Sequence, residues 1–196
     1  MSFTASVRHF QTLVLAFHPV IVIETVEEER VYGLINAACK DLQISVFEWS
    51  VAQGLVRSQG SPHNRWQNEY APPGAQRPQP IAKTNDPLDM LRHIQDLTCK
   101  GIYWLKDFAE HLKDATVARQ FREVADQFAY NQSTLVISGS DINLPVSIAH
   151  DVIYFDVKLP EPDELYQAIS EVVRSLKGKV KVDLTPEDIH ALVQAM

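Results

Sequence analysis

The sequence predicts an α/β fold in which helices cover both faces of a five-stranded parallel β-sheet, giving three layers. Residues 20–23 read Val-Ile-Val-Ile, a β-branched run without polar alternation, which is typical of a strand buried on both faces. Further short apolar segments follow, separated by helical or turn-rich sequence. These predicted strands span residues 44–49, 102–105, 134–138 and 152–157.

Amphipathic helices are predicted before, between and after these strands. Apolar residues share one helical face over residues 4–17, and Pro19 disfavours helix before it. Thr25 and Glu28 have the spacing of a capping box, which predicts a helix starting directly after the first strand, at Thr25. Caps, first-turn prolines and apolar stripes predict further helices at residues 86–97, 115–130, 162–176 and 185–196.

A long loop is predicted at residues 57–87, which hold six of the 11 prolines and few aliphatic residues. Trp66 and Tyr70 are unusual for a linker. They are candidates for anchoring a partner, but folding onto their own domain is the favoured interpretation.

Composition and charge exclude several classes of protein. The 196 residues carry 18 Lys and Arg against 25 Asp and Glu, a net charge of −7, which disfavours sequence-independent binding to nucleic acid. Two cysteines, Cys39 and Cys99, are too few for a disulfide framework and are expected to be inert buried thiols. The apolar stretch 13–23 is broken by Pro19 and is shorter than the roughly 20 residues of a membrane span.

Polar clusters follow three of the predicted strands. In an open parallel sheet, ligands bind at the carboxyl ends of the strands. The residues there are Glu24 and Thr25, the segment Lys106-Asp107-Phe108, and the segment Ser138-Gly139-Ser140-Asp141. The order of these segments is similar to that of a P-loop-type NTPase core, in which a strand enters a phosphate loop and a later strand ends in a magnesium-binding acid.

The turn after the first strand lacks the residues of a phosphate loop. A phosphate cradle needs glycines and a lysine, whereas residues 24–29 read Glu-Thr-Val-Glu-Glu-Glu. Each exposed carboxylate favours the helix N-terminus by about 0.3–1 kcal/mol and takes the place of an incoming polyanion. We therefore expect a self-capped, structural turn that repels a nucleoside triphosphate. The alternative is a divalent cation held by Glu24, Asp107 and Asp141.

The chain resembles the N-terminal portion of the AAA-type ATPases encoded in cyanobacteria and some algal plastids as hypothetical chloroplast reading-frame products. The resemblance covers about residues 18–176. It rests on His-Pro-Val-Ile-Val-Ile-Glu-Thr at 18–25 with Glu-Glu-Glu-Arg at 27–30, and on residues 46–50, 54–55, 86–88, 103–108, 121–123, 144–145, 151–152 and 159–165.

This resemblance implies a degenerate AAA-like module of P-loop NTPase type at residues 1–176, followed by the beginning of a small helical lid at 177–196, cut before its helices are complete. Glu24, Thr25, Glu28, Asp107 and Ser138 then occupy degenerate nucleotide-site positions. Asp107 matches the metal-binding acid of the Walker B strand, and Ser138 falls near a sensor position. The glycines and lysine of the phosphate loop have no counterpart.

The resemblance also implies that ATPase activity, ATP and magnesium belong to a second, downstream module, and that this part of the protein needs no cofactor. Its expected partners are proteins or the downstream module, with no nucleic acid and no membrane span. The family implies a role in regulating photosynthesis or inorganic-carbon use, in the cytoplasm or the plastid stroma. Two functions follow: an interaction and assembly module, or a metal- or ligand-binding enzyme that uses the strand-end acids.

Overall fold

The computed structural model describes residues 3–58, 80–81, 83–97 and 99–157, the helix at 186–195, and residues 162, 165, 166, 169, 170 and 173. The chain divides into two compact units. Residues 7–157 form the larger one, and residues 1–6 with 158–196 form the smaller one. The larger unit holds the β-sheet and every predicted site residue that the structure describes.

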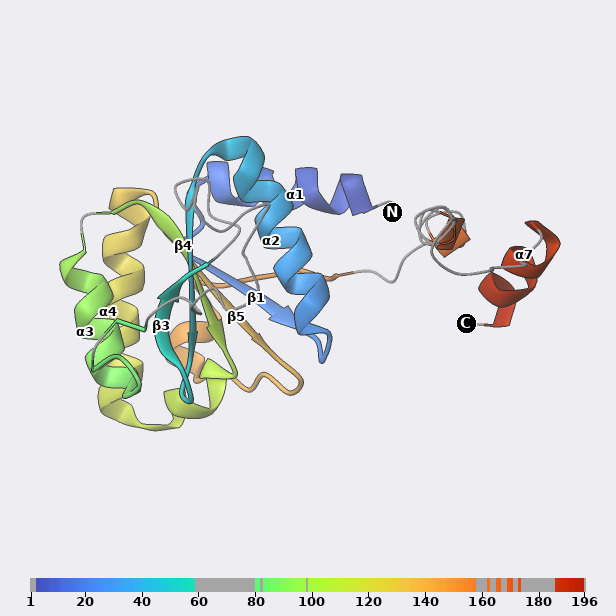
Figure 1. The fold of residues 1–196 in the computed structure, drawn as a ribbon. Coiled ribbons are helices and arrows are strands. Elements are labelled where there is room, and N and C mark those ends of the chain that lie inside the picture. The colour runs from blue at the N-terminus through green and yellow to red at the C-terminus, as the bar shows by residue number, and fades with distance from the viewer. Residues whose placement is uncertain are drawn as a thin grey trace. The chain divides into compact units, whose positions relative to one another are not determined.

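The sheet of the larger unit is mostly parallel, as predicted, but has six strands rather than five (Figure 1). Their order across the sheet is β3-β2-β4-β5-β1-β6, and every pairing is parallel except that of β3 with β2. The strands are β1 (Val20–Glu24), β2 (Ser45–Ser50), β3 (Gly54–Arg57), β4 (Gly101–Lys106), β5 (Thr134–Gly139) and β6 (Ile153–Tyr154).

The strand missed by the sequence prediction is β3, which forms an antiparallel hairpin with β2 at the edge of the sheet. It is four residues long and adjoins the predicted proline-rich loop, so its sequence is too short to show the apolar pattern of a strand. Gly54 begins it with φ of 76°, a conformation that favours glycine. A side chain there would also meet Thr84, because a Cβ atom would lie 2.9 Å from the Thr84 hydroxyl oxygen.

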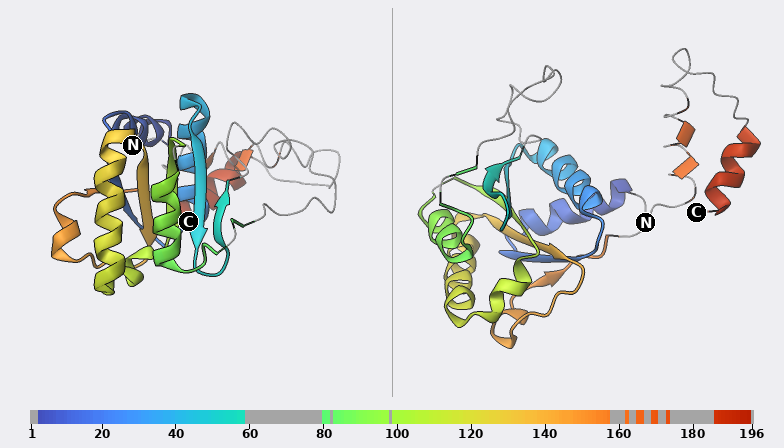
Figure 2. Two further views of the ribbon diagram at one scale, coloured as in Figure 1. Left: turned by 90° about the vertical axis from the view of Figure 1, so that its left-hand side faces the viewer. Right: turned by 60° about the horizontal axis from the view of Figure 1, so that its bottom comes forward.

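Helices cover both faces of the sheet, which confirms the three layers (Figures 1 and 2). Apolar residues of α1 and α2 pack on one face, and those of α3, η1 and α4 pack on the other. The helices of this unit are α1 (Phe3–Leu15), α2 (Glu28–Leu42), α3 (Pro87–Asp96), the 3₁₀ helix η1 (Phe108–Lys113), α4 (Ala115–Asn131) and α5 (Val146–Ala149). Neither η1 nor α5 was predicted, because both are too short to show a helical period.

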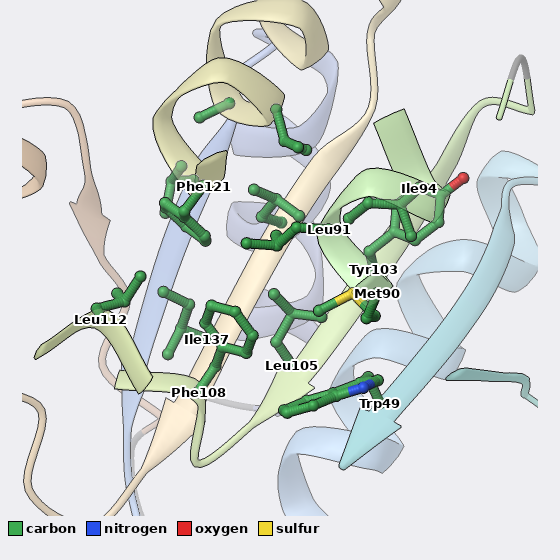
Figure 3. Close-up of a cluster of buried hydrophobic side chains, with 14 of the residues drawn as sticks. Trp49, Met90, Leu91, Ile94, Tyr103, Leu105, Phe108, Leu112, Phe121 and Ile137 are labelled. Atoms are coloured by element: carbon green, nitrogen blue, oxygen red, sulfur yellow. The ribbon is translucent and has the colours of Figure 1, made fainter. Parts of the chain in front are cut away.

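Large aromatic side chains pack among aliphatic ones in the core on the face of α3 and α4 (Figure 3). Trp49 and Phe108 meet edge to face, with ring centroids 5.2 Å apart, and Phe108 stacks on Phe121. The apolar stripe predicted for α4 is confirmed, since Val117, Phe121, Val124, Ala125 and Phe128 are all buried. The packing of these rings attaches η1 and α4 to the sheet.

Helix starts agree with the prediction in two cases and differ in one. The predicted cap is present at Asp86, whose carboxylate accepts from two backbone N–H groups of α3. The helix α4 starts at Ala115, as predicted, and the structure adds a cap that the sequence analysis did not name, because the Asp114 carboxylate accepts from two backbone N–H groups there. The N–H groups of Val117 and Thr116 lower the pKa of Asp114. The capping box at Thr25 is wrong: α2 begins at Glu28 with Glu27 as N-cap, and the Thr25 hydroxyl accepts the Glu27 N–H instead.

The second unit contains α7 (Pro186–Ala195), which confirms the predicted last helix and buries Ile189 and Val193. Most of the predicted 162–176 helix, the boundary at 176/177, Trp66 and Tyr70 lie outside the described residues. The predicted strand at 152–157 is shorter than expected, since β6 has two residues. Among the described helices, none has the length and apolar character needed to cross a membrane.

The two cysteines differ, which corrects the expectation of two buried thiols. Cys39 is buried in α2, and burial raises its pKa to about 12, so this thiol stays protonated near neutral pH. Cys99 is exposed. It lies in the connection between α3 and β4, where the sequence has no helical or strand periodicity from which burial could be predicted.

Thr84 fastens the connection after β3 to the sheet, within the segment predicted to be loop. Its buried hydroxyl accepts from the Leu55 N–H at 2.8 Å and donates to the Ile81 carbonyl at 2.6 Å. Its carbonyl accepts from the Trp49 indole at 2.5 Å. One residue thus anchors β3, β2 and the approach to α3.

We expect Thr84→Val to destabilise the protein by about 1–3 kcal/mol, because it leaves the buried Leu55 N–H without its acceptor. Thr84→Ser keeps the hydroxyl and is the matched control, with a smaller loss. Urea unfolding at equilibrium measures both variants. A Thr84→Val variant that is as stable as the natural chain, or more stable than Thr84→Ser, would contradict the role assigned to the hydroxyl.

Candidate functional site

The topological switch point of the sheet lies between β1 and β5, which are neighbours. The chain leaves β1 into α2 on one face, and after β5 it packs Ile142 and Ile148 on the opposite face. Loops that diverge from adjacent parallel strands open a crevice at their carboxyl ends, which is the usual ligand position in such sheets. The predicted location of the site is therefore present in the fold.

A hollow of about 210 Å³ occupies this switch point. Four predicted site residues, Thr25, Glu28, Asp107 and Ser138, line it, so the structure brings them together. Glu24 ends β1 with an exposed side chain and is not among the lining residues. The remaining lining residues are Val26, Gly139 and Ser140.

Backbone hydrogen bonds hold the strand ends together at this hollow. The Thr25 N–H donates to the Gly139 carbonyl, and the Asp107 N–H donates to the Ser138 carbonyl, each at 2.8 Å. Asp107 has a left-handed backbone, with φ of 54°. Its carboxylate lies against Gly139, where a Cβ atom would come within 3.3 Å of Oδ1. Gly139 thus leaves room for the carboxylate at the place where β4 and β5 end.

The side chain of Ser138 forms a hydrogen bond inside the protein. Its side chain is buried, and its Oγ accepts a hydrogen bond from the Trp104 indole N–H at 2.7 Å. Trp104 is also buried, on the face covered by α2. A buried indole needs such an acceptor, so the Ser138 hydroxyl oxygen has a structural role within the protein.

Lys106 ends β4 near the acidic turn, and two carboxylates pair with it. Its Nζ lies 3.2 Å from Glu28 Oε2 and 3.3 Å from Glu48 Oε2. The same ammonium lies over the Trp104 ring, 4.2 Å from its centroid. These contacts direct Lys106 into a neighbouring hollow lined by Glu28, Glu48 and Trp104, and it does not line the one at the switch point.

The turn between β1 and α2 satisfies its own polar groups. The Thr25 hydroxyl accepts the Glu27 N–H at 3.1 Å, and the Glu27 carboxylate pairs with Arg30 at 2.6 Å. Val26, at the tip of the turn, is exposed. Acidic side chains at the start of α2, Glu28 and Glu29, complement the positive end of its dipole. The turn therefore offers an anion neither a lysine nor a glycine-rich cradle.

The alternative of a metal held by Glu24, Asp107 and Asp141 is not supported by the geometry. The structure describes all three residues. Among the described residues, no group of three or more His, Cys, Asp or Glu side chains is arranged to hold a metal ion. The Asp141 carboxylate accepts from the Asn143 amide at 2.9 Å. Although the three acids all follow strands of the same sheet, their carboxylates do not converge on one point.

Sequence reasoning missed the parts of the site that depend on side-chain direction. Glu48 precedes the end of β2 and was not singled out, although the same strand-end rule applies to it. The contact of Trp104 with both Ser138 and Lys106 had no signal in the sequence. Phe108, which directly follows Asp107, is completely buried and packs against Trp49 and Phe121.

Residues 6–157 match the family described as the SpoVK-like AAA ATPase N-terminal domain. The chain belongs to this family. The match includes the whole six-stranded sheet and every residue of the site at its carboxyl edge. The resemblance to AAA-type ATPases read from the sequence is thereby confirmed, as is the N-terminal character of the domain.

Relatives of this N-terminal domain carry the name AAA domain-containing protein ycf46. The chain is 28% identical to the protein of Guillardia theta over 177 residues, 89% of this chain and 31% of the relative. It is 29% identical to that of Trieres chinensis over 167 residues, 84% of this chain and 30% of the relative. The chain spans about a third of the length of these relatives.

Solved structures support the same fold. A DNA replication initiation factor superposes with a TM-score of 0.56 at 10% identity, over 98% of this chain and 55% of the other. The replication initiator DnaA, bound to AMPPCP and single-stranded DNA, gives 0.54 at 10% identity, also over 98% of this chain and 55% of the other. At this identity the likeness concerns the fold alone, and it confirms the α/β class.

We expect Lys106→Met to destabilise the domain by about 1 kcal/mol, because Glu28 and Glu48 lose their shared counter-charge. Lys106→Arg keeps the charge and should cost less. In a double-mutant cycle with Glu48→Gln, the coupling should be about 0.5–1 kcal/mol by urea unfolding. Independent effects of the two substitutions would contradict a working ion pair at the end of β4.

Proposed function

We propose that this chain is the non-catalytic AAA-like module of a larger AAA-type ATPase, and that it serves protein interaction and assembly. The observation that carries the proposal is the charge of the switch-point turn. Glu24, Glu27, Glu28 and Glu29 stand where a nucleotide-binding sheet needs glycines and a lysine. A triphosphate at this turn would meet like charges and an occupied helix N-terminus.

The contacts of Lys106 support the same proposal. Its ammonium already has two carboxylate partners, Glu28 and Glu48, so a phosphate would have to displace one of them. Ser138 likewise already accepts a hydrogen bond from Trp104. The degenerate site is thus stabilised by its own side chains and needs neither ATP nor magnesium to hold its shape. In this proposal, ATP hydrolysis belongs to another module of the whole protein.

Nucleotide is expected to leave the melting temperature of the chain unchanged, with or without magnesium. A ligand present at about 100 times its Kd stabilises the folded state by about 2.7 kcal/mol. For a domain of this size that raises the melting temperature by roughly 5–10 °C. Differential scanning calorimetry with ATP, ADP and each with magnesium makes the measurement, with magnesium alone as the reference.

Asp107→Asn is the control variant for this experiment. It removes one carboxylate from the hollow while keeping the size of the side chain, so it tests the acid that matches the Walker B position. A rise of several degrees with MgATP in the natural chain that disappears in Asp107→Asn would overturn the proposal. Such a result would identify the hollow as a working nucleotide site.

The physiological setting that we propose follows from the family. It is the regulation of photosynthesis or of inorganic-carbon use, in the cytoplasm or, in an alga, the plastid stroma. The similarity to proteins of Guillardia theta and Trieres chinensis supports the family assignment on which this rests. Growth of a strain that lacks the module, at limiting and at saturating carbon dioxide, tests it. If this strain grew as well as the natural strain at both carbon dioxide levels, the result would count against this role.

A further inference from the structure

A second hollow, away from the switch point, is lined by residues of α4, of the amino end of β1 and of the short helix α5. Its volume is about 280 Å³. Its apolar surface comes from Pro19, Val20, Phe121, Ala125, Ala129 and Ile148. We call it the α4 groove. It lies at the opposite end of β1 from the acidic turn.

The α4 groove has a firm apolar floor and a small-residue wall. Val20, Phe121 and Ile148 are at most 2% exposed, so the floor is part of the packed core. Ala125 and Ala129 lie one helical turn apart on α4, and their short side chains leave the hollow open. Pockets for cofactors and drug-sized ligands have volumes of about 300–1,000 Å³. At about 280 Å³ the α4 groove is smaller than these pockets, so it suits a single large side chain.

Three charged residues surround this apolar surface: Arg122, Asp126 and Asp151. All three are exposed, and within the described part of the chain none of them forms an ion pair. Two acids and one base give the rim a net charge of −1. A rim of this sign is complementary to a cationic group placed beside an apolar one.

We propose that the α4 groove docks a protein partner through a short segment in which one bulky apolar side chain is followed by a lysine or arginine. The apolar side chain enters between Ala129 and Ile148, and the cation meets Asp126 and Asp151. This inference rests on the interaction role proposed above and names the chemistry of the partner. It uses none of the residues at the switch point.

The test is an NMR titration of the whole ¹⁵N-labelled chain with three capped dipeptides. The probe is acetyl-Phe-Arg-amide, and the references are acetyl-Phe-Glu-amide, which reverses the charge, and acetyl-Ser-Arg-amide, which lacks the apolar group. We expect the probe to shift amide signals of residues 121–129 and 148–151 and to bind at least about tenfold more tightly than either reference. Equal binding of all three, or no shift in these residues, overturns the proposal.

Two variants locate the binding. Ala129→Trp fills the groove from an exposed helical position, and Asp126→Lys reverses the rim charge; each should weaken the probe at least about tenfold. Asp96→Lys, at an exposed position on α3, makes the same change in net charge and should leave binding unchanged. If Ala129→Trp does not fold, Asp126→Lys against Asp96→Lys decides alone. Equal weakening by these two would overturn the proposal.

A second copy of the chain is the competing occupant. Sedimentation of the natural chain and of Ala129→Trp distinguishes it: a dimer that the substitution dissociates would overturn the dipeptide-like partner. The nucleotide experiment is independent of all these measurements. Failure of the dipeptides with no effect of ATP on melting removes this inference alone, whereas a rise in melting temperature with MgATP removes the proposed function at the other end of β1.

Discussion

Burial of β1 on both faces is the constraint on which the rest of the larger unit depends. Val20, Ile21, Val22 and Ile23 are at most 1% exposed, so their alternate side chains require apolar partners above and below the sheet. Val20 and Val22 belong to the core shared with α3 and α4, and Ile21 and Ile23 to the core shared with α1 and α2. A central strand of this kind needs helical crossovers to both sides.

Those crossovers also create the switch point. Because β5 and β6 both pair with β1, the chain passes from one side of β1 to the other, and the loops after β1 and β5 diverge. The crevice at their carboxyl ends is a consequence of the topology, independent of whether the residues in it bind anything. The hollow at this position is therefore a property of the fold, whatever its side chains bind.

The electrostatics of the hollow are the basis of our proposal that it does not bind a nucleotide. Carboxylates complement the dipole of α2, and Lys106 is placed between Glu28 and Glu48 above the Trp104 ring. These ion pairs neutralise Lys106 within the protein, at the carboxyl edge of the sheet. This pairing supports our proposal that the domain acts through contacts with proteins, at surfaces such as the α4 groove.

The sequence by itself determined the features that depend on local pattern: the buried run of β1, the stripe of α4, the cap at Asp86, and a turn at residues 24–29 that contains neither glycine nor lysine. Tertiary structure decided what local pattern does not encode. The two-residue β6 and the hairpin strand β3 exist through pairing with neighbours, and the partners of Ser138 and Lys106 come from strands distant in sequence. Periodicity reports which face of an element is buried, whereas only packing sets which side chains from different elements meet.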